Sequence, residues 1–315
     1  MNGVIDRCPT GIVGFDKLCD GGFVRNSDNL IVGGPGSGKS TFLLQFLWNG
    51  ATMFGENGLY CSFEPDIVDT LGDSMAHDWD FAKLSEEGKI KFMRFAPQTS
   101  IEELKAELTK MISKNDIRRI CFDPVSVLAL SLSDRGKIRQ TIFDLSSLMK
   151  RLRVTTVFAD ESLEGEMNWT NGDEWTKTDI LRFLSDSVSI FYESPIAGVG
   201  DRSIRIAKMR RTAHEREAVG MTITDKGVEV LGKRGELVNN KEERDRDVHF
   251  DMIPKVVRRP VAQENIAIVP VRAAPIEPRV VAPVVRASPT ERVSVRSNSM
   301  EKEPRSVYAS SSVVT

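Results

Sequence analysis

The sequence has few cysteines and no long apolar run. Its 315 residues contain four cysteines, and none of them forms a C-x-x-C pair; they are Cys8, Cys19, Cys61 and Cys121. No apolar run approaches the roughly 18 to 20 residues that cross a bilayer, and the first residues, MNGVIDRCPTG, lack a basic segment followed by an apolar one. We therefore expect a cytoplasmic protein without a transmembrane segment, whose cysteines are reduced thiols in or near the core.

An excess of charge of either sign is also missing. The formal net charge is −2, which excludes a bulk attraction to nucleic acid but not a local basic patch. Hydrophobic residues make up 40% of the chain, which is enough for a sizeable core. The composition therefore predicts a globular protein of one large or two small domains.

A glycine-rich stretch, GGPGSGKST, is the first clear motif. It fits G-x-x-x-x-G-K-[ST], with Gly33, Gly38, Lys39 and Ser40 at the fixed positions. An apolar strand-like run precedes it and a helical pattern follows it, which is the context of a phosphate-binding P-loop. The predicted nucleotide-binding residues are Gly33, Gly34, Pro35, Gly36, Ser37, Gly38, Lys39, Ser40 and Thr41.

The chemistry of this loop predicts ATP with Mg²⁺ as the ligand. Backbone N–H groups of the loop and the N-terminus of the helix attract a polyphosphate. Lys39 is expected to reach the β- and γ-phosphates, and the Ser40 hydroxyl to coordinate Mg²⁺. The alternative is a glycine-rich turn that happens to precede a helix, which the agreement of motif and flanks disfavours.

Strand-like and helical runs alternate after the loop, which predicts a parallel α/β sheet. Strands are expected at 58–63, 90–95, 119–122 and 155–159, and helices at 66–76, 101–112 and 138–152. From Ser187 onward, strands follow without intervening helices, with a turn at Asp225 to Gly227. We expect these strands to form an antiparallel extension at one edge of the sheet.

The composition changes near Gly235. Residues 236–315 carry a mixed charge run and then a Pro-, Val-, Arg- and Ser-rich segment with two similar pieces, VPVRAAP at Val269 and APVVRASP at Ala282. Regular prolines forbid a long helix or a central strand there. We expect an ATPase domain at 1–235 and a disordered tail at 236–315, acting as a spacer or as a docking or phosphorylation segment.

Two carboxylates follow predicted strands. Asp123 ends the run RRICFD and is expected to hold Mg²⁺, and Glu64 follows the strand after the P-loop helix and is expected to orient the attacking water. Both then lie at the carboxyl edge of the sheet, where ligands of open α/β sheets bind. Either acid alone could be a helix cap or a solvated loop residue.

At this point the chain resembles the KaiC-like branch of the RecA-type ATPases. The resemblance covers about residues 8 to 232, through TGIVGFDKLCDGGF, the P-loop, YCSFEPD, HDWDFAKLSEEGKIKF, RRICFDPVS, FLSDSV, KMRRTAH and MTITDKGVEV. It implies a RecA-like core, ATP with Mg²⁺, and a hexameric ring in which the neighbouring subunit completes each site. Lys208 and Arg210 match the cations that such proteins extend across the interface toward the γ-phosphate. From the residues alone, a basic edge strand kept soluble by its charge would explain them as well.

The chain departs from the clock protein KaiC in two respects. Where that protein has two consecutive glutamates, this chain has Glu64 followed by Pro65, and it has one P-loop instead of two. Slow hydrolysis is therefore expected, and the resemblance gives no ground for expecting autophosphorylation.

Three functions fit this pattern. The first is a ring-forming regulatory ATPase that passes its nucleotide state to a protein partner. The second is a non-catalytic ATP-binding motor accessory resembling archaellum FlaH, and the third is a RadA-type DNA recombinase. The acidic stretch from Ser162 to Asp179 disfavours nucleic acid, because phosphate binding wants the opposite charge. Its Trp169 and Trp175 either meet a partner or fold back on the core.

Overall fold

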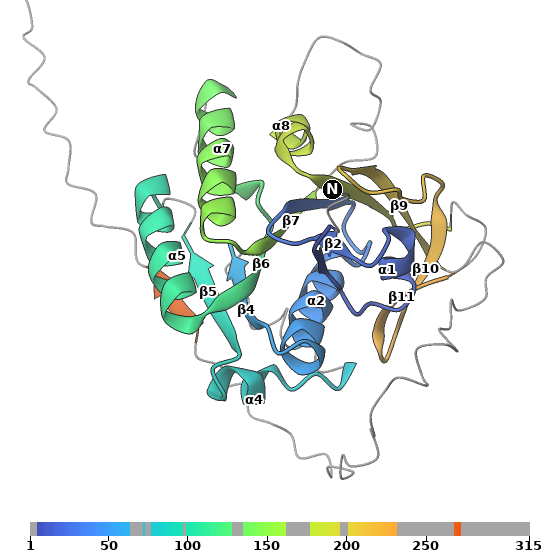
Figure 1. Cartoon of the computed structure of the whole chain (residues 1–315), viewed down its shortest axis with the longest axis horizontal. Coiled ribbons are helices and arrows are strands. Elements are labelled where there is room, and N and C mark those ends of the chain that lie inside the picture. The colour runs from blue at the N-terminus through green and yellow to red at the C-terminus, as the bar shows by residue number, and fades with distance from the viewer. Residues whose placement is uncertain are drawn as a thin grey trace, which may run out of the picture. The chain divides into compact units, whose positions relative to one another are not determined.

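The computed structural model describes residues 5–63, 72, 77–96, 99–127, 135–161, 177–195, 201–231 and 268–271. The fold is a RecA-like α/β domain built on one large sheet (Figure 1). The described helices are α1 (Phe15–Leu18), α2 (Lys39–Met53), α4 (Phe81–Glu86), α5 (Ile101–Asn115), α7 (Arg135–Arg151) and α8 (Lys177–Leu184). The first described strands, β1 (Arg7–Cys8) and β2 (Phe23–Val24), form a separate antiparallel pair.

The large sheet has ten strands within the described residues, in the order β11-β10-β9-β8-β3-β7-β6-β4-β5-β12. The strands are β3 (Asp28–Gly33), β4 (Asn57–Ser62), β5 (Ile90–Phe95), β6 (Ile117–Asp123), β7 (Thr155–Glu161), β8 (Ser187–Tyr192), β9 (Arg202–Met209), β10 (Val219–Thr224), β11 (Gly227–Val230) and β12 (Ile268–Val271). In this order, every neighbouring pair of β8-β3-β7-β6-β4-β5-β12 is parallel. The neighbouring pairs of β11-β10-β9-β8 are antiparallel. The predicted antiparallel extension is therefore confirmed.

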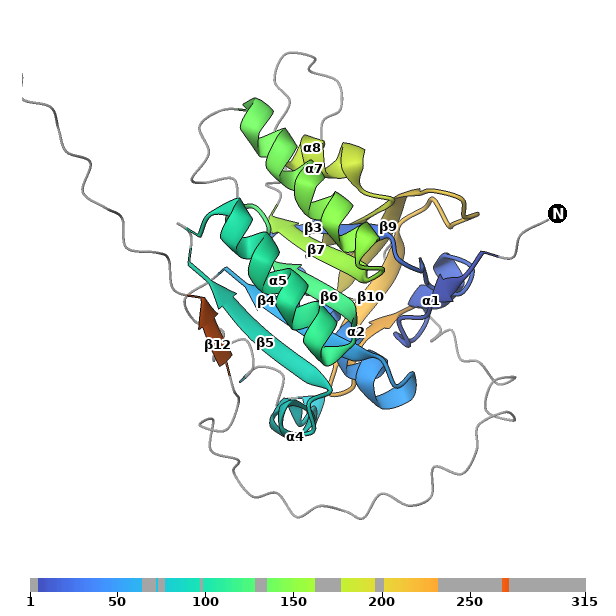
Figure 2. The same cartoon turned by 60° about the vertical axis from the view of Figure 1, so that its left-hand side comes forward.

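Helices cover both faces of the sheet, α2 on one face and α5 with α7 on the other (Figures 1 and 2). The strands supply both cores because their side chains alternate between faces. In β6, Cys121 belongs to the cluster around α2, while Ile120 and Phe122 belong to the cluster under α5 and α7. Parallel strands buried on both faces read as continuous apolar runs, which is why the sequence predicts them well.

The four cysteines are free and buried, as predicted. Burial is the main reason why the pKa of Cys8 rises to about 11 and that of Cys19 to about 12. These thiols therefore stay protonated at neutral pH and are poor nucleophiles.

Some predicted elements differ from the structure or fall outside it. The helix predicted at 66–76 lies outside the described residues, apart from residue 72. Helix α8 begins at Lys177, inside the acidic stretch, whose residues 162–176 also lie outside. The basic edge-strand alternative for Lys208 is wrong, because β9 pairs with β8 on one side and with β10 on the other. Within the predicted tail, Ile268–Val271 forms β12, and the other residues after Leu231 are outside the described part.

Candidate functional site

The predicted P-loop connects the central strand β3 to helix α2. Gly38 precedes the helix at φ +94°, where L side chains rarely fit, and a Cβ there would lie 2.7 Å from Cδ1 of Ile223. A Cβ on Gly33 would lie 2.6 Å from the carbonyl oxygen of Phe191. Two of the fixed motif glycines are thus required by the packing of this loop against β8 and β10.

The Lys39 side chain folds over the loop. Its Nζ donates hydrogen bonds to the carbonyl oxygens of Gly33 at 2.9 Å and Gly34 at 2.8 Å, and the residue is only 8% exposed. The ammonium is therefore held in the concavity between strand and helix. An ammonium held there can attract the oxygens of a bound phosphate.

The N-terminus of α2 suits an anion. No side chain caps it among the described residues, and its first turn contains no acid. The first N–H groups of a helix have no intrahelical acceptor, and the helix dipole places partial positive charge at this end. Together with Lys39, these donors fit the phosphates that the motif predicts.

Ser40 and Asp123 meet beside the loop. The Ser40 hydroxyl donates to Oδ2 of Asp123 at 2.7 Å, and the Tyr60 hydroxyl donates to the same oxygen at 2.6 Å. Asp123 is 8% exposed and ends β6, as predicted. A hydroxyl and a carboxylate fit Mg²⁺, which is commonly held by one or two protein oxygens together with phosphates and water.

Glu64 lies outside the described residues, so its role as base or polariser stays a prediction. Strand β4 ends at Ser62, which pairs with Asp123 in the sheet. The strand before Glu64 therefore ends at the same edge of the sheet as the strand before Asp123.

Lys208 and Arg210 do not lie at the carboxyl ends of the parallel strands, where the P-loop lies. Because β9 runs antiparallel to β8, Lys208 pairs with Val188 near the beginning of β8, whereas Gly33 pairs with Phe191 near its end. The Lys208 ammonium donates to the carbonyls of Arg182 at 2.9 Å and Phe183 at 3.1 Å. Its side chain thus reaches the C-terminal end of α8, beyond the start of β8 and away from the P-loop of the same chain.

One acid, Asp186, lies beside these two cations. Asp186 accepts the backbone N–H of Arg210 on its carbonyl oxygen at 2.9 Å, and its carboxylate lies 3.6 Å from the Arg210 guanidinium and 2.9 Å from the Lys150 ammonium. Burial, followed by the nearby charge of Arg210, lowers the pKa of Lys208 to about 8. The cations are thus held as a group at the amino ends of the central strands.

Two residues near the P-loop were not predicted from the sequence. Tyr60, which donates to Asp123, is a polar aromatic inside an apolar strand. A hydroxyl within that apolar run is the only signal of it in the sequence. Arg202 begins β9, and its Nε donates to the carbonyl of Gly36 at 3.0 Å. It is a cation of the same chain in contact with the loop, and nothing in its spacing distinguishes it from the other arginines of β9 and the turn that follows.

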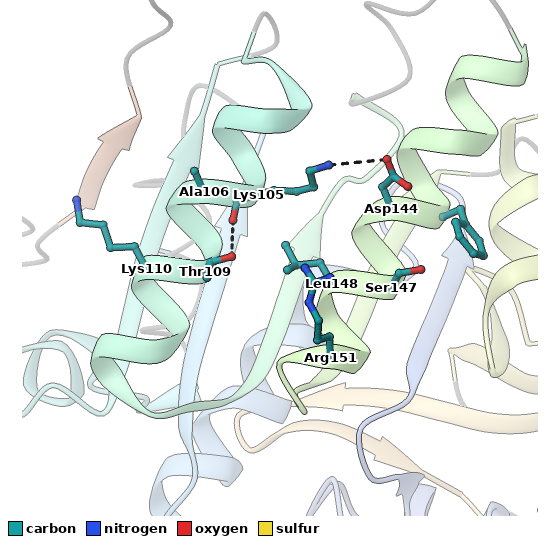
Figure 3. A pocket seen from close by; sticks show the side chains of 9 residues that line it. Lys105, Ala106, Thr109, Lys110, Asp144, Ser147, Leu148 and Arg151 are labelled. Carbon is teal, nitrogen blue, oxygen red and sulfur yellow. Dashed lines mark hydrogen bonds and ion pairs between the residues drawn. The ribbon is translucent and has the colours of Figure 1, made fainter.

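A pocket of about 570 Å³ lies elsewhere, between α5 and α7 (Figure 3). Lys105 points across it toward Asp144, with 3.8 Å between Nζ and Oδ2. Arg151 lies near Leu148 between the helices. These helices cover the face of the sheet opposite α2. The pocket is therefore separate from the P-loop.

The family model described as "ATPase: KaiC" matches residues 8–235. The chain belongs to the KaiC ATPase family. The predicted resemblance, the RecA-like core and a P-loop of the nucleotide-binding type are thereby confirmed.

Curated relatives include the circadian clock oscillator protein KaiC of Synechococcus elongatus, 28% identical over 236 residues, or 72% of this chain and 44% of the relative. The circadian clock protein KaiC2 of Synechocystis is 28% identical over 249 residues, or 76% of this chain and 42% of the relative. The chain thus spans less than half of each relative. A KaiC-like protein of the archaeon Pyrococcus horikoshii has a similar structure, with a TM-score of 0.62 and 27% identity, covering 73% of this chain and all of that one.

Within the described residues, no helix has the length and apolar character needed to span a membrane.

Proposed function

We propose that this KaiC-family chain binds ATP with Mg²⁺ at its P-loop, hydrolyses it slowly and passes its nucleotide state to a protein partner. The observation that carries the proposal is the 2.7 Å hydrogen bond from Ser40 to Asp123. It joins the helix that begins at Lys39 to the acid that ends β6. These are the groups that a Mg²⁺–polyphosphate complex requires.

The position of Lys208 and Arg210 supports assembly into a ring. Within one chain they lie at the amino ends of the strands, whereas the P-loop lies at the carboxyl ends. They can therefore serve a γ-phosphate only in another copy, where a cation stabilises the charge that spreads over the phosphoryl oxygens. The proposed assembly is a hexameric ring in the cytoplasm, with Glu64 orienting water on one side of each interface.

Mixing two inactive variants tests this proposal. Glu64→Gln and Arg210→Ala should each retain ATP and lose hydrolysis, by about 10³-fold or more for the arginine. In a random equimolar mixture, about one interface in four pairs an intact Glu64 with an intact Arg210. Phosphate release should therefore reappear on mixing.

Arg205→Ala is the matched control, because Arg205 is an exposed arginine of β9, the strand that ends directly before Arg210, and donates to the carbonyl of Arg216. This variant should hydrolyse ATP at the wild-type rate. If co-assembly is shown by chemical cross-linking and hydrolysis does not return, the shared site is wrong. If the wild type binds ATP without any turnover, the accessory function resembling FlaH replaces the ATPase.

The partner can be sought with the same nucleotide dependence. Pull-downs from native lysate with ATP and with ADP should retain a protein in only one of the two states. Salt-dependent DNA binding would instead favour the recombinase function.

A further inference from the structure

The outer edge of β5 carries a strand from far along the chain. On one side β5 pairs with β4, and on the other it pairs in parallel with β12, from Ile268 opposite Phe92 to Val271 opposite Phe95 (Figure 2). Residues 232–267, which separate β12 from the rest of the domain, are outside the described part. A segment of the tail region thus occupies the last open edge on this side of the sheet.

An edge of this kind is a ready surface for pairing. Without β12, β5 would present a row of backbone N–H and C=O groups that can pair with another extended chain. Its side chains leave little protection, because Ile90, Phe92, Met93 and Phe95 are buried in the cores and Arg94 is its one exposed side chain. The edge therefore favours an extended apolar segment whose backbone supplies most of the contacts.

The ladder between β12 and β5 is short. It contains four residue pairs, and the nitrogen of Pro270, which carries no N–H, faces away from β5. Proline in a sheet is confined to edges, so no further strand can add beyond β12 at this residue. A ladder of this length is weak unless a tether keeps the two strands near each other, at an effective concentration of about millimolar.

We propose that the outer edge of β5 is a docking site for an extended apolar segment, and that the chain's own Ile268–Val271 is its resident and exchangeable occupant. The tether favours this occupant over a free peptide of the same sequence. The tail contains a second piece of the same chemistry, APVVRASP at Ala282, which resembles VPVRAAP at Val269. Displacement of β12 would expose the edge to that piece in another copy or to a partner with a similar segment.

Disulfide trapping in the full chain tests the site. In the Arg94→Cys/Pro270→Cys variant, the new thiols lie on directly paired residues, about 4.8 Å apart between Cα atoms, which a disulfide can bridge. The four native cysteines are buried and should not compete. Mild oxidation should give an intramolecular disulfide, seen as a monomer on a non-reducing gel and as a linked peptide by mass spectrometry.

The control is Lys91→Cys/Pro270→Cys, which moves one thiol by three residues, about 10 Å along the strand, and to the opposite face of the sheet. It should cross-link at least tenfold more slowly. Equal rates in the two variants would overturn the docking site, and mainly intermolecular disulfides would overturn the occupant in cis in favour of a second copy. A synthetic peptide of residues 265–274, NIAIVPVRAA, should slow trapping at millimolar concentration, whereas a scrambled peptide should not; no effect of either peptide would overturn exchange.

A second measurement does not depend on cysteines. Because the N–H directions alternate along a strand and the nitrogen of Pro270 faces outward, the N–H of Val269 faces β5. Val269→Pro removes this N–H from the ladder and should speed hydrogen exchange of the β5 amides, while the β4 and β6 amides keep their wild-type rates. Unchanged exchange in β5 would overturn the pairing.

Discussion

Lys39 and Asp28 are two buried charged residues in different surroundings. The ammonium of Lys39, the first residue of α2, is held by two loop carbonyls, whereas Asp28 begins β3, at the end of that strand away from the loop, and is 1% exposed. Oδ2 of Asp28 accepts a hydrogen bond from Ser146 at 2.5 Å and lies 3.5 Å from the Lys150 ammonium, while Oδ1 has no partner among the described residues. One charge is thus poised for a ligand and the other is incompletely compensated.

We predict that Lys39→Ala abolishes ATP binding and keeps the fold. A hydrogen bond to a charged group contributes about 1.5–3 kcal/mol, so affinity should fall by at least about tenfold. Titration with a fluorescent ATP analogue measures the affinity, and circular dichroism checks the fold. Lys110→Ala, which removes an exposed lysine of α5, is the control and should bind normally. Equal affinities would exclude Lys39 from the site.

We predict that Asp28→Asn removes part of the pH dependence of stability. Burial is the main reason why the pKa of Asp28 rises to about 6, with Asp186 adding to the rise and Ser146 and Lys150 opposing it. The folded state then holds more protons than the unfolded state between about pH 4 and pH 6, so wild-type stability falls as pH rises through this window.

Urea unfolding from pH 4 to pH 7.5 measures the effect. The free energy of unfolding of Asp28→Asn relative to wild type should rise across the window by about 1–3 kcal/mol. Asp116→Asn, which removes a carboxylate on an exposed turn, should run parallel to wild type. If the free energy of unfolding of Asp28→Asn also changed with pH in parallel with that of the wild type, the raised pKa of Asp28 would be contradicted.

At the scale of elements, the sequence predicted what periodicity controls. The strands from β3 to β8 are apolar because both of their faces are buried, and helices α5 and α7 alternate between core and solvent. The short elements α1, α4, β1 and β2 have too few residues for a period to emerge, so tertiary packing decides them. Within the site, motif and strand end predicted the loop and Asp123, whereas the contacts of Tyr60 and Arg202 arise only when distant strands come together.

The P-loop offers a matched pair of glycine substitutions. At Gly38 the positive φ strains any L side chain, and a Cβ would also push Cδ1 of Ile223 aside, whereas at Gly34 nothing lies within 4 Å. Gly38→Ala should therefore lower stability by about 1 kcal/mol or more and weaken ATP binding, while Gly34→Ala should leave stability nearly unchanged. Thermal unfolding and ATP titration compare the two; the reverse order would mean that the loop has another conformation.

At the scale of the molecule, residues Met1–Ala274 and Pro275–Thr315 form separate units. The second unit is rich in residues that bury little apolar surface, so its removal should leave the melting temperature and ATP affinity within error of wild type. A chain ending at Leu231 also loses β12 and should aggregate more readily, because the edge of β5 is then open. Light scattering at equal concentration compares the aggregation of the two truncated chains. A melting temperature several degrees lower after removal of Pro275–Thr315 would contradict the unit boundary.

Lys208 lies at the amino ends of the central strands and the P-loop lies at their carboxyl ends, and this separation has a consequence for symmetry. If the cations of one copy serve the loop of the next, each contact joins two unlike surfaces, and a two-fold dimer cannot satisfy both ends. An open row always has one complete site fewer than it has subunits, whereas a closed ring has as many as subunits. Closing a ring of six raises the number of complete sites per subunit only from about five-sixths to one, so activity per subunit should rise gradually with assembly and level off at closure.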